Sequence, residues 1–84
     1  MYSFDILPEA REQANTLPSE ALSFYAELLV FLELTPWAGK PYNNKEPNGA
    51  MRSQAFGPKE QGLAVYLVLQ QQRRVVMLSI TWIE

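Results

Sequence analysis

The sequence contains no cysteine and no histidine. Without cysteine there is no disulfide and no thiolate nucleophile, and without histidine there is no imidazole acid–base chemistry and none of the usual zinc ligands. Any catalysis therefore has to rest on lysine, arginine, carboxylates, tyrosine or hydroxyl groups. No spacing of these side chains indicates a metal or cofactor site, so no cofactor is expected.

Charge and long apolar runs are also scarce. Charged residues make up 19% of the 84 residues, and no apolar run approaches the roughly 20 residues of a membrane span. The opening residues "MYSFDILPEAR" lack the basic and apolar segments of a signal peptide, which predicts a cytoplasmic protein without membrane association. The length predicts a single domain over residues 1–84. Because the net charge is −2, nucleic-acid binding would need a local basic patch.

The spacing of apolar residues predicts an α+β fold. Alternation over residues 2–7 indicates a half-buried strand, and Pro8 suits the start of a short helix that ends at Pro18. A second helix, apolar almost all round, is expected to start at Ser19 and to end just before Pro36. After a loop over residues 36–49, three strand-like runs, "AMRSQAF", "LAVYLVLQ" and "RVVMLSITWI", predict an antiparallel meander. The helices should pack on one face of this small antiparallel sheet.

The last two strands are apolar on both faces, which points to a protein partner. One face has to cover the helices, and the other would be an aggregation risk if it stayed exposed. The partner-binding face is expected to hold Tyr66, Val68, Val75 and Met77. The surplus of apolar residues on the second helix favours a partner as well.

Four segments in this order resemble the RelE/ParE superfamily of type II toxin–antitoxin toxins. They are "LPEA", "LP" followed by a leucine-rich helix, "GKPYNNKEPNGAMR", and "VYLVLQQQRRVVMLSITWI". The resemblance implies a β-α-α-β-β-β fold, a cognate antitoxin as partner, and assembly as a homodimer or a toxin–antitoxin hetero-oligomer. It also implies that the chain is a RelE-like endoribonuclease that cuts mRNA in the ribosomal A site. Two alternatives stay open: a ParE-like toxin that acts on DNA gyrase by protein–protein contact, and a toxin-fold binding module that has lost its activity.

By the same resemblance, Arg52 matches the first basic residue of the second-strand motif in the mRNA-cutting branch. RNA cleavage by the 2′-hydroxyl needs a base, cations for the charge growing on phosphate, and an acid for the leaving oxygen. The active-site hypothesis takes Arg52 as phosphate clamp, Lys59 as second cation, and Glu60 or Glu84 as base. The alternative for Arg52 is a solvated strand residue, and for Lys59 and Glu60 a charged hairpin turn.

The loop before the second strand mixes cations and aromatic residues. Lys40 and Lys45, with Arg52, are candidate RNA-binding residues, because charge and base stacking together bind single-stranded RNA. In the alternative interpretation, Trp37 and Tyr42 pin the loop to the core.

Overall fold

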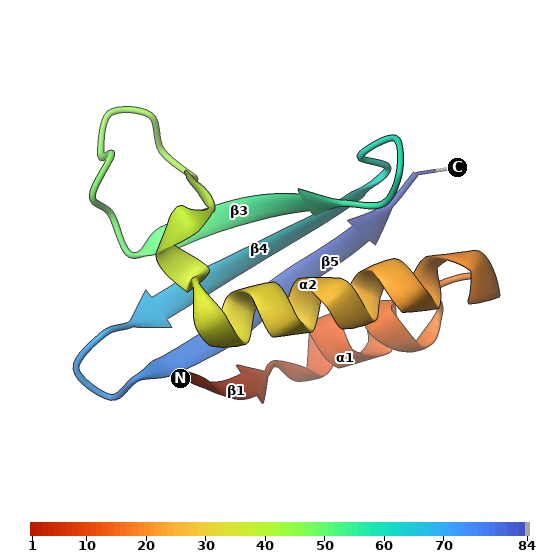
Figure 1. The fold of residues 1–84 in the computed structure, drawn as a ribbon, viewed down its shortest axis with the longest axis horizontal. Coiled ribbons are helices and arrows are strands. Elements are labelled where there is room, and N and C mark those ends of the chain that lie inside the picture. The colour runs from red at the N-terminus through yellow and green to blue at the C-terminus, as the bar shows by residue number, and fades with distance from the viewer. Residues whose placement is uncertain (84) are drawn as a thin grey trace.

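The computed structural model describes residues 1–83, which form one mixed sheet with two helices packed on one face (Figure 1). In chain order the elements are β1 (Ser3–Ile6), α1 (Pro8–Asn15), the 3-10 turn η1 (Ser19–Ala21), α2 (Leu22–Leu34), the 3-10 turn η2 (Pro36–Ala38), β2 (Lys40–Pro41), β3 (Met51–Phe56), β4 (Gly62–Leu69) and β5 (Arg74–Trp82). The α+β fold class predicted from the sequence is confirmed.

Prolines set the limits of both helices. Pro8 occupies the first turn of α1, where its missing N–H costs nothing and Glu9 faces the positive end of the helix dipole. The second helical segment differs from expectation at its start, because Ser19 begins the turn η1 and no side chain caps α2. The longest helix among residues 1–83 is α2, with 13 residues, and none of them has the length and hydropathy to cross a membrane.

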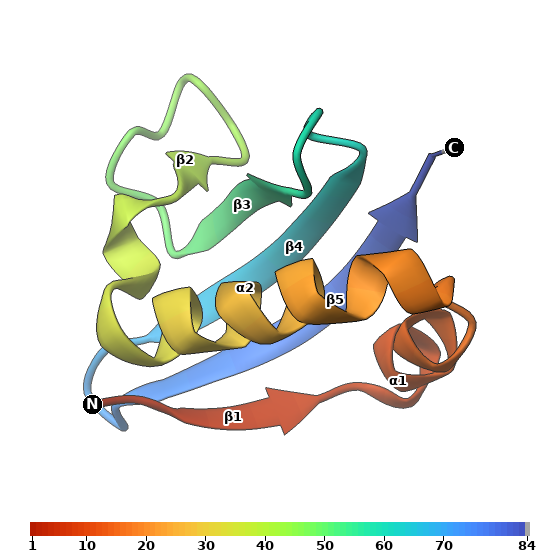
Figure 2. The same cartoon turned by 45° about the vertical axis from the view of Figure 1, so that its right-hand side comes forward.

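The sheet has the strand order β1-β5-β4-β3-β2 (Figure 2). The predicted antiparallel meander of β3, β4 and β5 is confirmed. The sheet as a whole is mixed, however, because β1 runs parallel to β5. This pairing is accessible because the whole helical layer separates the two strands in the chain, and parallel neighbours need such a crossover. The two-residue strand β2 lies in the segment expected to be loop and pairs with β3.

The core lies between the helices and the face of the sheet that carries Tyr66. Its buried members are Tyr2, Ala10, Leu28, Leu32, Phe56, Ala64, Tyr66, Val68, Val75, Met77 and Ile80. The expectation that Tyr66, Val68, Val75 and Met77 form a partner-binding face is therefore wrong, because all four side chains are covered by the helical layer. Both faces of β4 are apolar, and alternation alone gave no means of deciding which face the helices would cover.

A β-bulge changes the side-chain alternation of β5. Val65 pairs with Ser79 and Tyr66 with Met77, so Leu78 is an extra residue between the two pairs. Beyond the bulge, Ile80 shares the buried face with Met77, whereas strict alternation places it on the opposite face. The bulge lies where β1 has ended, and there the backbone N–H of Ile80 donates to Gln13 Oε1 of α1 at 2.7 Å.

Candidate functional site

Arg52 of β3 is buried and bonded to the loop that precedes its strand. Its side chain is 7% exposed. Nε and Nη2 donate to Gly39 O at 3.2 and 2.8 Å, and Nη1 donates to Pro47 O at 3.3 Å and to Gly49 O at 3.0 Å. Because these four bonds use most of the five guanidinium N–H groups, Arg52 has little donor capacity left for a phosphate. The structure therefore corrects the assignment of Arg52 as phosphate clamp and RNA-binding residue. Arg52 instead ties residues 39–49 to the sheet. Because it is buried, the alternative of a solvated strand residue is wrong as well.

Two aromatic side chains complete the anchor around Arg52. The guanidinium carbon lies 5.2 Å from the centroid of the Trp37 ring, a cation–π distance. Tyr66, which pairs with Arg52 across β3 and β4, donates its hydroxyl to Pro36 O at 2.6 Å. Burial raises the pKa of the Tyr66 hydroxyl to about 12, and the Arg52 charge and the Gly39 backbone oppose part of that rise.

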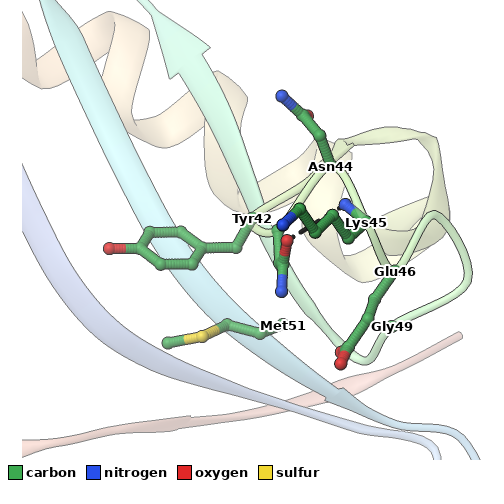
Figure 3. A pocket seen from close by; sticks show the side chains of 7 residues that line it. Tyr42, Asn44, Lys45, Glu46, Gly49 and Met51 are labelled. Carbon is green, nitrogen blue, oxygen red and sulfur yellow. Dashed lines mark hydrogen bonds between the residues drawn. The ribbon is translucent and has the colours of Figure 1, made fainter.

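Trp37 and Tyr42 play different roles in the loop. Trp37 Nε1 donates to Gln70 Oε1 at 2.7 Å, so Trp37 ties the loop to the turn after β4 rather than to the core. Tyr42 is 58% exposed and does not pin the loop to the core. Its ring extends beside Met51 at the edge of a cavity of about 610 Å³ (Figure 3). Lys45 lines the same cavity, so an exposed aromatic ring and a cation do lie together here.

The β3–β4 turn holds Lys59 and Glu60 in a tight conformation. The Lys59 backbone N–H donates to Gln61 Oε1 at 2.8 Å, and the Glu60 N–H donates to Gly57 O at 3.1 Å. Glu60 has φ of 56°, in the left-handed region that non-glycine residues seldom adopt. The turn therefore fixes the backbone from which the Glu60 carboxylate projects.

A small cavity brings Lys40 and Glu60 together on one side of the sheet. Its volume is about 130 Å³, and it is lined by Lys40, Ser53, Gln54, Ala55, Glu60 and Leu63. Lys40 reaches it because β2 pairs Lys40 with Ser53, and Glu60 reaches it from the turn. Lys59 is not among the lining residues, and Glu84 lies outside the described residues.

Basic and acidic residues are segregated between the two layers. Residues 8–35, which form the helical layer, contain five glutamates and one arginine, a formal charge of −4. Residues 36–83, which form most of the sheet and its loops, contain six basic and two acidic residues, a formal charge of +4. The net charge of −2 thus conceals a basic sheet layer, which includes the exposed Lys40, Lys45 and Lys59.

The adjacent arginines after β4 are structural. Arg74 makes a bidentate pair with Asp5, with Nε to Oδ2 at 2.8 Å and Nη2 to Oδ1 at 2.6 Å, and this pair lowers the pKa of Asp5. Arg73 has φ of 54°, and its guanidinium carbon lies 4.7 Å from the centroid of the Tyr2 ring. Both side chains contact the N-terminal segment, at the opposite end of the sheet from the Lys40–Glu60 cavity.

Solved RelE toxins share this fold over nearly the whole chain. The isolated Escherichia coli RelE toxin gives a TM-score of 0.79 at 19% identity, covering 100% of this chain and 86% of that chain. The intact E. coli RelBE toxin–antitoxin complex gives 0.79 at 19% identity, covering 100% and 99%. The Mycobacterium tuberculosis RelBE2 toxin–antitoxin complex gives 0.74 at 22% identity, covering 98% of each chain. No protein-family model and no curated protein matches the sequence.

The chain therefore has the fold of the solved RelE toxins. The resemblance seen in the sequence motifs is confirmed for the fold.

Proposed function

We propose that this chain is the toxin of a type II toxin–antitoxin system and that it cuts mRNA on the ribosome. The observation that carries the proposal is the cavity shared by Lys40 and Glu60 on the basic layer of a RelE fold. A cation and a carboxylate at one cavity are two of the groups that 2′-hydroxyl cleavage requires.

Lys40 takes the role that the sequence assigned to Arg52. Its ammonium group is exposed and can donate hydrogen bonds to the phosphoryl oxygens as negative charge grows on them. The Glu60 carboxylate accepts the proton of the 2′-hydroxyl, whose oxygen forms a bond to phosphorus while the bond from phosphorus to the 5′ oxygen breaks. The leaving 5′ oxygen takes a proton from water. The products are a 2′,3′-cyclic phosphate and a free 5′-hydroxyl.

The loop over residues 42–49 supplies a second contact for the same RNA strand. Tyr42 offers an exposed ring for base stacking, and Lys45 beside it offers a cation for the backbone (Figure 3). Arg52 acts only through the loop that it fixes, so it is a positioning residue in this proposal.

A cognate antitoxin is the proposed protein partner. Two solved relatives with this fold are toxin–antitoxin complexes, and a toxin that arrests its own cell has to be held inactive. We expect co-expression with the antitoxin encoded beside this gene to restore growth.

The test is cleavage of a short mRNA bound to purified ribosomes, read as 5′ ends by primer extension. Lys40→Gln and Glu60→Gln should each lower the cleavage rate by about a hundredfold or more, because each removes a group that acts on the reacting atoms. Arg11→Gln and Glu12→Gln, exposed changes of the same type on α1, should leave the rate unchanged. Full cleavage by Lys40→Gln and Glu60→Gln would overturn the assignment of the site.

The Arg52 guanidinium is occupied by loop carbonyl groups, and this observation favours a second candidate function. In that case the chain is a ParE-like toxin that acts on DNA gyrase by protein–protein contact without cutting RNA. Such a toxin needs no arginine at a scissile phosphate. If the folded wild-type chain leaves ribosome-bound mRNA intact and inhibits supercoiling by purified gyrase, this candidate replaces the first.

A further inference from the structure

The outer face of α2 carries an apolar row that nothing in residues 1–83 covers. Leu22, Ala26, Val30 and Leu34 follow one another at intervals of four residues, and all four are exposed. Leu22 is 51%, Val30 57% and Leu34 59% exposed, although they stand on the helix whose opposite side, with Leu28 and Leu32, is buried. Large aliphatic side chains in a continuous row mark an interaction surface more often than scattered ones do.

The spacing of the row determines what kind of partner fits it. Residues four apart form the ridge that packs into the groove of a second helix at about −50°. The row runs the length of α2, which lies across the front of the molecule with its outer side open (Figure 2). A helix with its own apolar stripe is therefore the complementary shape.

The charges beside the row determine the chemistry of that helix. On a helical projection, Glu27 and Glu33 flank the row on either side, and α2 contains no basic residue. The preceding elements η1 and α1 carry two further exposed carboxylates, Glu20 and Glu12. A second copy of this chain would bring glutamates against glutamates, whereas a helix bordered by lysine or arginine would pair with them.

We propose that α2 is a docking surface for an amphipathic helix of a partner protein that carries basic residues on both sides of an apolar stripe. The surface lies on the opposite layer from the Lys40–Glu60 cavity, so it is independent of the proposed cleavage of RNA. Binding through it buries the row and neutralises part of the −4 charge of the helical layer.

The probe is a synthetic helical peptide with leucine at every fourth position and lysine on both flanks, labelled for fluorescence anisotropy. A second peptide with the same leucines carries glutamate in place of each lysine. The lysine peptide should bind the full chain at least about tenfold more tightly than the glutamate peptide, and its affinity should fall as salt is raised. Equal affinity for both peptides, or no binding of either, would overturn the proposal.

Variants of the chain locate the binding. Val30→Glu should abolish binding of the lysine peptide, and Met51→Glu, on the sheet face away from the helices, should leave it unchanged. The double charge reversal Glu27→Lys with Glu33→Lys keeps the apolar row and should reverse the preference, so that the glutamate peptide binds better. Circular dichroism is used to check that each variant is folded. A wild-type dimer in sedimentation that Val30→Glu converts to monomer would identify a second copy as the occupant and would contradict the proposal.

Discussion

The Arg52 guanidinium donates two hydrogen bonds to one acceptor, the carbonyl oxygen of Gly39, from Nε at 3.2 Å and from Nη2 at 2.8 Å. Arg52, which the sequence analysis predicted to bind phosphate, thus holds in place the loop that carries Lys40 and Lys45. The loop has two residues of regular strand, and the guanidinium supplies the bonds that a longer strand would otherwise make.

Removal of the Arg52 side chain should destabilise the fold. Arg52→Ala leaves the carbonyl groups of Gly39, Pro47 and Gly49 without their charged donor, so the free energy of unfolding should fall by about 2–4 kcal/mol. Arg52→Lys should recover little of this loss, because an ammonium group lacks the planar fork. Urea denaturation measures the change.

The control for this experiment is Arg11→Ala on α1, an exposed arginine in a helix. It should change the free energy of unfolding by about 0.5 kcal/mol or less. Equal stability of Arg52→Ala and Arg11→Ala would show that the loop does not depend on Arg52.

Gly39 should not accept any side chain. A Cβ at this position would overlap the Tyr66 hydroxyl and lie 2.9 Å from Ser53 O, so Gly39→Ala should cost about 1–3 kcal/mol of unfolding free energy. In a Tyr66→Phe background the hydroxyl is gone, and Gly39→Ala should cost less. Thermal melts of the four combinations measure this coupling, and an additive result would contradict the close approach. Gly49→Ala, whose Cβ would lie 3.1 Å from Glu46 O at its nearest, is the milder comparison.

Stability should fall in alkali because of Tyr66. Its pKa is raised from 10.0 to about 12 by burial, so the folded chain retains a proton that the unfolded chain loses. The stabilisation is complete below about pH 10 and is lost as pH rises toward about 12, on the order of 2 kcal/mol in all. Burial also raises the pKa of Tyr25, which adds to the slope.

The measurement is the free energy of unfolding in urea across this alkaline range. Tyr66→Phe should be less stable at neutral pH, because Pro36 O loses its donor, and should show a shallower alkaline slope. An unchanged slope in Tyr66→Phe would mean that other groups cause the alkaline loss.

The sequence predicted the helices because prolines lie at their ends, and it predicted the meander because short polar turns separate three strand-like runs. It could not predict which face of β4 is buried, since Val65 and Leu67 on one face are as apolar as Tyr66 and Val68 on the other. The bulge at Leu78 could not be predicted either. An extra residue shifts the alternation by one position, and this shift cannot be recognised where both faces of the strand carry apolar residues. Strict alternation along β5 therefore puts Ile80 on the wrong face.

The candidate site was predicted in part. Glu60 and Lys40 were named, and the structure shows that they line one cavity. Arg52 was misassigned because the partners of its guanidinium are backbone carbonyl groups of the preceding loop, and no side-chain pattern encodes them. The glycines at positions 39 and 49, on either side of that loop, were the one available hint that the backbone approaches something closely.

Growth arrest in bacterial cells tests the proposal that the activity depends on Lys40 of the Lys40–Glu60 cavity. Wild type, Lys40→Gln and Arg11→Gln are expressed to equal soluble levels without antitoxin, and growth is followed by optical density. We predict arrest by wild type and Arg11→Gln and normal growth with Lys40→Gln. Full growth arrest by a folded Lys40→Gln variant would contradict the assignment of Lys40 to the active site.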